Sequence, residues 1–210
     1  MKILSIYDLF LLGDHHQALK KTAKTDAEIS WQIGSASFLG QLDVAEILFK
    51  KMNTKSSIAH FFMGLSYSRI SKYANARYHF GQNLKLLTKS HRNNSDKKIS
   101  NEELFFIYQG IAFYRRLTCR FAVAIRWSEL SFQSAYKKLP PWFEILSHDL
   151  KGQCLIDRGQ ISQGMQLLKR AHKIAIENKY HGLQQALDVT MMNTKAQHGD
   201  GGLQLTKQIE

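Results

Sequence analysis

The stretch Met63-Gly64-Leu65-Ser66-Tyr67, followed by Tyr73-Ala74-Asn75-Ala76-Arg77-Tyr78-His79-Phe80, decides the fold of this chain. Each half carries a small residue and an aromatic residue at helical spacing, and the turn former Ser71 lies between the halves. Gly64 and Ala76 allow two antiparallel helices to approach closely, while the aromatic residue that ends each half fills the volume beside them. The stretch therefore predicts a tight helical hairpin.

The pattern of a turn former followed five residues later by a small residue recurs along the chain. The pairs are Gly13 with Ala18, Gly40 with Ala45, Ser71 with Ala76, and Gly159 with Gly164. Gly13 and Gly40 lie 27 residues apart, and Gly40 and Ser71 lie 31 apart, close to the period of about 34 residues in helix-pair arrays. A fourth unit, Gly110-x-x-Phe113 with Phe121-x-x-Ala124, matches less closely, and its turn is expected to be about two residues longer. The sequence thus predicts about five helix pairs.

The third unit resembles the tetratricopeptide repeat family, and so does the fifth, which reads Lys151-Gly152-x-x-Leu155 and then Ile161-x-x-Gly164-x-x-x-Leu168-x-x-Ala171. The family consensus places a glycine and an aromatic residue on the first helix, and a small, an aromatic and a second small residue on the second helix. No unit has the proline that often closes a repeat, so the resemblance is to a degenerate array. It implies an all-α fold, a right-handed α-solenoid of about five antiparallel helix pairs over residues 1–198.

Two segments interrupt this expected array. Residues 90–101 are rich in turn formers and have no apolar period, so we interpret them as an insertion. Ser100 with Glu103 forms a capping box that restarts the helix, and Pro141 fits the first turn of a later helix. Residues 199–210 begin with a glycine-rich flexible hinge. They are expected to form a partial C-terminal cap or the start of a linker, or the chain is the front part of a longer protein.

The composition is that of a folded, helical chain. Of its 210 residues 44% are hydrophobic, which is enough for a substantial core, and only 2 are proline. The apolar run Leu9–Leu12 is too short for a secretory segment or a membrane span. Cys119 and Cys154 do not form a CxxC pair, which suits a reducing compartment. We therefore expect a cytoplasmic protein with no membrane span.

The positive charge is concentrated in the middle of the chain. The formal net charge is +12, and residues 77–138 contribute 12 basic and 4 acidic side chains to it. Two thirds of the excess charge therefore lies in this region. Such a region attracts nucleic acid, an anionic membrane surface or an acidic protein, because all three respond to the same long-range field.

The sequence shows no recognisable catalytic arrangement. It contains no P-loop, GxSxG or HExxH motif, and its nine histidines form no i,i+4 pair on an expected helix. His15 and His16 are expected in a turn, where adjacent side chains diverge. Cys119 lies close to arginines that could lower a thiol pKa, but we interpret it as a structural cysteine. We expect no enzyme activity, metal or cofactor.

The candidate binding surface is the concave wall of the expected array. We number the first helix of each unit from its glycine, which is position 0, and each residue adds a rotation of 100° about the helix axis. Positions −3, +1, +4 and +5 then share one side of the first helix. The resemblance implies that this side faces the concave surface. In the fifth unit it holds Asp149, Gln153, Ile156 and Asp157. The predicted partner-binding residues are Phe61, Leu65, Ser68 and Arg69 in the third unit, Ile107, Ile111, Tyr114 and Arg115 in the fourth, and Gln153 in the fifth.

These residues predict the chemistry of the partner. Family members that clamp a C-terminal carboxylate use Lys, Asn and Arg at several of these positions, which are largely apolar here, so the sequence argues against that ligand. Apolar side chains with a few arginines suit a protein or peptide that has apolar anchors and acidic groups. We therefore predict a non-catalytic interaction scaffold or regulatory module. The alternative is a helical-repeat protein that binds nucleic acid through residues 77–138, with steep salt dependence.

Overall fold

The computed structural model of the chain describes residues 4–92 and 99–205. Within these residues there are eleven helices and no strand, which confirms the predicted all-α class. The helices are α1 (Ile6–Leu12), α2 (His15–Lys20), α3 (Asp26–Phe38), α4 (Leu42–Lys51), α5 (Ser57–Arg69), α6 (Tyr73–Arg92), α7 (Asn101–Leu117), α8 (Phe121–Ala135), α9 (Pro141–Asp157), α10 (Ile161–Glu177) and α11 (His181–Leu205).

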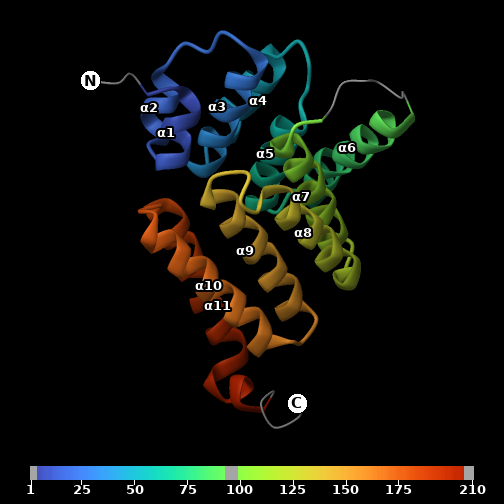
Figure 1. Cartoon of the computed structure of the whole chain (residues 1–210), viewed down its shortest axis with the longest axis vertical. Coiled ribbons are helices and arrows are strands. Elements are labelled where there is room, and N and C mark those ends of the chain that lie inside the picture. The colour runs from blue at the N-terminus through green and yellow to red at the C-terminus, as the bar shows by residue number, and fades with distance from the viewer. Residues whose placement is uncertain (1–3, 93–98, 206–210) are drawn as a thin grey trace.

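Consecutive helices pack as pairs, because connections of two or three residues leave the chain no path except to fold back on itself. The pairs are α1 with α2, α3 with α4, α5 with α6, α7 with α8, and α9 with α10. The odd-numbered helices also pack on one another in succession from α1 to α9, which places the pairs side by side (Figure 1). α11 packs on α10 and contacts α9.

The same turn closes six of these connections. In each turn one residue has a positive φ, and the next residue donates its N–H to the carbonyl five residues earlier, at 2.9–3.0 Å. The donors are Asp14, Gln41, Lys72, Arg120, Gln160 and Tyr180. The turn formers predicted at Gly13, Gly40, Ser71 and Gly159 are confirmed in the left-handed position. Cys119 and Lys179 occupy it in the other two turns, for which the sequence analysis named no turn former.

The helix ends confirm some local predictions and correct others. Ser100 and Glu103 form the expected capping box, and Pro141 is the first residue of α9. α6 extends to Arg92 and so covers the start of the predicted insertion, of which residues 93–98 lie outside the described residues. α11 continues through residues 199–202, where a hinge was expected, because glycine weakens a helix by only about 1 kcal/mol per residue. Residues 206–210 lie outside the described residues.

Glycines lie where paired helices cross closely. A Cβ atom on Gly64 would lie 2.5 Å from the ring of Phe80, so α5 and α6 approach as the sequence predicts. In the fifth pair two glycines face each other. A Cβ on Gly164 would lie 2.5 Å from the carbonyl oxygen of Gly152. A side chain at Gly164 would force α9 and α10 apart, because a backbone atom obstructs it.

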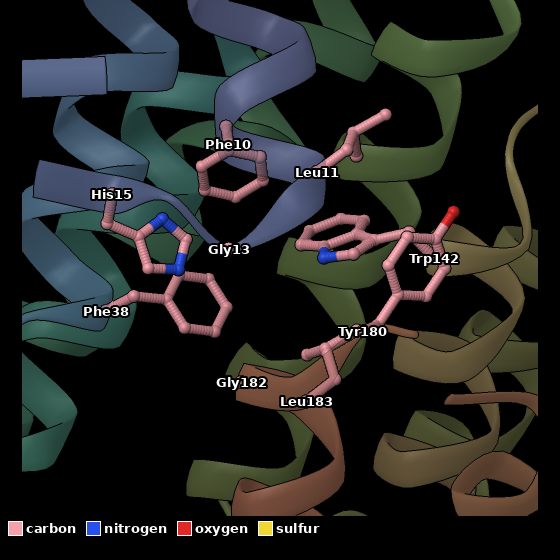
Figure 2. A pocket seen from close by; sticks show the side chains of 9 residues that line it. All are labelled: Phe10, Leu11, Gly13, His15, Phe38, Trp142, Tyr180, Gly182 and Leu183. Atoms are coloured by element: carbon pink, nitrogen blue, oxygen red, sulfur yellow. The ribbon is translucent and has the colours of Figure 1, made fainter. Parts of the chain in front are cut away.

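The core is a circuit of aromatic rings to which every odd-numbered helix from α1 to α9 contributes. The ring centroids lie 4.9 Å apart for Phe10 and Trp31, 6.0 Å for Trp31 and Phe62, 5.5 Å for Phe62 and Phe106, 5.8 Å for Phe106 and Phe143, and 5.2 Å for Trp142 and Phe10. Figure 2 shows Phe10 and Trp142 at the junction of α1 and α9. The first and fifth pairs therefore touch, and the rings fill the space that they enclose.

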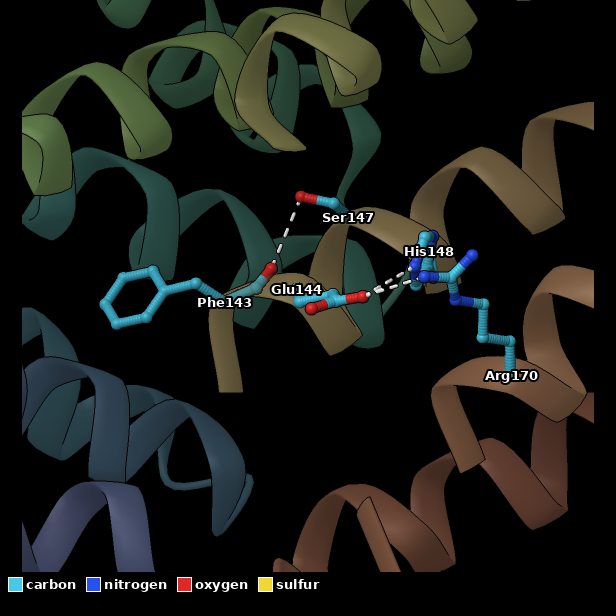
Figure 3. A network of polar contacts seen from close by, with 5 residues as sticks. All are labelled: Phe143, Glu144, Ser147, His148 and Arg170. Atoms are coloured by element: carbon cyan, nitrogen blue, oxygen red, sulfur yellow. Dashed lines mark hydrogen bonds and ion pairs between the residues drawn. The ribbon is translucent and has the colours of Figure 1, made fainter. Parts of the chain in front are cut away.

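A polar network joins α10 to α9 (Figure 3). Glu144 Oε1 lies 3.2 Å from His148 Nε2 on the same helix and 3.4 Å from Arg170 Nη2 on α10. Burial, with Arg170 nearby, lowers the pKa of His148 below its ordinary value. Near neutral pH the imidazole is therefore uncharged, and its contact with Glu144 is a hydrogen bond.

Candidate functional site

Two adjoining clefts form the candidate site, and we call them together the groove. The outer cleft has a volume of about 640 Å³ and is lined by Ser68, Tyr73, Arg77, Arg116, Leu117, Phe121 and Asp157. The inner cleft has a volume of about 220 Å³ and is lined by Arg116, Gln153, Ile156, Asp157, Thr190, Asn193, Thr194 and Gln197. Arg116 and Asp157 line both clefts, so the two clefts adjoin at this pair of residues.

The outer cleft lies where three successive hairpins turn. Ser68, Leu117 and Asp157 are in the last turns of α5, α7 and α9. Tyr73 and Phe121 are the first residues of α6 and α8, immediately after the left-handed turns. Because these turns share one geometry, they bring equivalent positions of the three hairpins to the same edge of the protein. The inner cleft then continues between α9 and α11.

An ion pair marks the boundary between the two clefts. Arg116 Nε lies 2.6 Å from Asp157 Oδ2, and Arg116 Nη1 donates to Gln153 Oε1. Gln153 in turn donates to Asp149 Oδ1 at 2.7 Å. Burial opposes the charged form of Arg116, but Asp157 outweighs it and raises the pKa of Arg116 above its ordinary value. Arg116 therefore stays charged and fixed in orientation.

Two of the nine predicted partner-binding residues, Ser68 and Gln153, line the groove. Phe61, Ile107 and Ile111 are buried and cannot contact a partner in this conformation. Phe61 belongs to the aromatic core, with its ring centroid 5.1 Å from that of Phe106. Phe61 and Ile107 lie in the N-terminal halves of α5 and α7, and the aromatic core occupies the space beside them.

The other four predicted residues are engaged within the protein. Leu65 is half-buried and packs against the core. Arg69 donates to the carbonyl of Ser37 and lies 5.2 Å from the ring of Phe38. Tyr114 approaches Gly81 of α6, and the guanidinium of Arg115 lies 5.5 Å from the Tyr114 ring. None of these four lines either cleft.

The error in the fourth unit is one of register. Its turn is no longer than the others, because Cys119 lies as far from the end of α7 as Ser71 lies from the end of α5. Gly64 lies seven residues before the turn residue Ser71. The residue seven positions before Cys119 is Ala112, so Ala112 rather than Gly110 is the counterpart of Gly64. Gly110 instead packs against the side chain of Asn83 on α6. A shift of two residues rotates the predicted face by about 200°.

The corrected register recovers groove residues that sequence reasoning missed. With Ala112 as origin, positions +4 and +5 become Arg116 and Leu117, and both line the outer cleft. The signal that could have found them is the number of residues between the reference position and the left-handed turn residue. This number is seven in the third, fourth and fifth units, whereas the fourth unit has its glycine two residues earlier. Three further groove residues, Tyr73, Arg77 and Phe121, lie on the second helices of their pairs. All of the predicted residues were on first helices. The groove residues of α11 lie within the predicted array of residues 1–198, but none of them was predicted to bind a partner.

The fold and groove define an all-helical protein with a surface site built from successive hairpins. Neither a family model, nor a curated protein sequence, nor a solved structure matches the chain. The described residues contain no group of three or more His, Cys, Asp or Glu side chains placed to hold a metal ion. Over the same residues, no helix has the length and apolar character needed to cross a membrane.

Proposed function

We propose that the chain is a tetratricopeptide-like solenoid, a right-handed superhelix of five antiparallel helix pairs, and that it is a non-catalytic interaction scaffold or regulatory module. Six connections that close with the same hydrogen bond support this arrangement. The successive packing of the odd-numbered helices supports it as well, because helix-pair arrays align the first helix of every pair along one surface. The contact between Phe10 and Trp142 brings the first and fifth pairs of this array together.

We place the bound protein segment in the groove, and the lining of the groove carries the proposal. Asn193 and Gln197 offer amide groups that can bond to both the N–H and the C=O groups of a peptide backbone. Leu117 and Phe121 offer apolar surface to an anchoring side chain. No reaction is needed to explain these groups. The two cysteines are unpaired, and we assign the protein to the cytoplasm.

Site-specific photocrosslinking tests this proposal. Asn193 lines the inner cleft and Gln185 does not, although both are exposed residues of α11. We expect a benzophenone amino acid at residue 193 to capture a protein partner in extracts of the native cell, and the same probe at residue 185 to capture much less of it. Equal capture at both positions, or capture at neither, would contradict peptide binding in the groove.

The distribution of charge favours nucleic acid as a second candidate partner. Of the acidic residues described between 77 and 138, Glu102 bonds to Tyr7, Glu103 caps α7, and Glu129 pairs with Lys151. Over the described residues of the same region, the basic side chains without an ion-pair partner include Arg77, Lys85, Arg120, Arg126 and Lys138. Such a surplus of exposed cations attracts phosphates.

Binding of a fluorescent 20-nucleotide oligothymidylate tests this candidate. If phosphates are bound, the logarithm of the affinity falls linearly with the logarithm of the salt concentration, with a slope of about −0.7 for each phosphate neutralised on a single strand. We expect weak binding that is lost at physiological salt, because the cations are spread over several helices. Tight binding that persists at physiological salt would favour nucleic acid as the partner.

A further inference from the structure

The outer cleft is surrounded by unpaired positive charge. Arg77 lines it, and Lys72 and Arg120 are in the two hairpin turns that border it. All three side chains are exposed and have no ion pair or hydrogen bond to another described residue. The carboxylate in the lining belongs to Asp157, which Arg116 neutralises. A ligand that enters the outer cleft therefore meets a net positive field.

Apolar side chains stand beside these cations. Tyr73, which lines the outer cleft, is 51% exposed, and Ile70 in the adjoining turn is 46% exposed. Leu117 and Phe121 are half-buried in the cleft wall. Covering such side chains with an apolar group removes their surface from water, which favours association. The outer cleft thus combines charge attraction with an apolar contact surface.

The inner cleft has a different character. Gln153, Thr190, Asn193, Thr194 and Gln197 are uncharged hydrogen-bonding side chains, and the cation of this cleft is Arg116 at its boundary. The positive field therefore declines along the groove from the hairpin turns towards α11. A nucleic acid carries a phosphate on every nucleotide, so it needs cations along the whole length of the bound strand. A peptide with acidic residues at one end of the bound segment matches this gradient.

We infer that the groove binds an extended peptide whose acidic side chains lie in the outer cleft, next to a large apolar side chain, and whose uncharged backbone continues along the inner cleft. This inference rests on the proposed function. Arg77 is the unpaired cation that meets the acidic side chain, and Tyr73 with Phe121 contacts the apolar one. Arg116 has further N–H donors beyond those engaged by Asp157 and Gln153, so it can bond to the same carboxylate.

Selection of phage-displayed random peptides on the full chain tests the inference. We expect the retained peptides to be enriched in Asp and Glu beside an aromatic or large aliphatic residue. The best of them, synthesised with a fluorophore, should bind at least about tenfold more weakly to the double variant Arg77→Glu and Arg120→Glu. The double variant Arg126→Glu and Lys138→Glu is the matched control, since it changes the net charge equally and neither residue lines the groove. It should bind the peptide like the original chain.

The outcomes separate this inference from the proposed function on which it rests. Retained peptides without acidic residues, or equal loss of affinity in both double variants, would overturn the inference. The proposed function would still hold in that case if Asn193→Arg, in the inner cleft, abolished binding. If no peptide is retained while the oligothymidylate binds at physiological salt, both ideas fail. Circular dichroism of each variant establishes that the fold is intact, so that a loss of binding reports on the groove.

Discussion

Replacing Gly164 by alanine adds one methyl group where α10 crosses α9. Its Cβ atom would lie 2.5 Å from the carbonyl oxygen of Gly152 and 2.6 Å from Ile156 Cγ1, and ordinary contacts begin at about 3.4 Å. A side chain can rotate away from a new neighbour, but a carbonyl oxygen in a helix cannot without losing its hydrogen bonds. The two helices must therefore move apart.

The magnitude follows from two opposing effects. Overpacking a well-packed site costs about 1–3 kcal/mol, and the upper end applies here because a backbone atom obstructs the methyl group. Alanine in place of glycine inside a helix gains about 1 kcal/mol. We therefore expect Gly164→Ala to lower the free energy of unfolding by about 2 kcal/mol. In a domain of this size that corresponds to a fall in Tm of about 4–8 °C.

Gly81→Ala is the matched control. Gly81 lies inside α6, and a Cβ there would meet its nearest atoms, in the Tyr114 ring, at 3.7 and 3.8 Å. It gains the same helix propensity without a clash, so it should stabilise the protein by up to about 1 kcal/mol. Urea unfolding followed by circular dichroism at 222 nm measures both variants. If Gly164→Ala stabilised the protein as much as Gly81→Ala does, the close crossing of α9 and α10 would be refuted.

Three further predictions concern acid stability, a buried amide and protease sensitivity. Burial lowers the pKa of His60 and of His79 to about 4 from an ordinary value of 6.5. Between these two pH values the unfolded chain binds more protons than the folded chain, so Tm should fall as the pH is lowered from 7 to 4.5. The fall in Tm should be smaller in the double variant His60→Gln and His79→Gln. Gln32 donates to the carbonyls at residues 18, 19 and 21, so Gln32→Leu should lower the urea midpoint by an amount equivalent to about 1–3 kcal/mol, and an unchanged midpoint would show that water replaces the amide. Three glycines within residues 199–202 weaken α11 there by about 1 kcal/mol each, so limited proteolysis with mass spectrometry should find a first cut near these residues, and first cuts inside α9 or α10 would contradict this.

The sequence by itself determined the helices and most of their turns, because the signals for both are local. A left-handed residue, followed five positions later by a small residue, describes a hairpin turn within a few residues of chain. Gly13, Gly40 and Gly159 could therefore be placed without any knowledge of distant contacts. The capping box at Ser100 and the proline at residue 141 are equally local, and both start helices as expected.

The tertiary structure decided which side of α7 faces the groove, because the left-handed residue from which the register is counted is Cys119, which is not a turn former. Gly110 and Ala112 are both small and lie two positions apart, so the sequence offers two helical registers that differ by a rotation of about 200°. The choice depends on Asn83, which occupies the space beside Gly110 and leaves Ala112 as the counterpart of Gly64. A neighbouring helix therefore fixes the register, and with it the exposure of Arg116.

The closure of the array was likewise decided by tertiary structure alone. Phe10 and Trp142 are separated by more than a hundred residues, and their ring centroids lie 5.2 Å apart. The periodicity of the sequence identifies Phe10 and Trp142 as apolar residues on helices. The curvature that brings them together is the sum of the packing angles between successive helix pairs, from the first pair to the fifth. That accumulated curvature buries Phe61 in the aromatic core, whereas the outer cleft lies at the hairpin turns.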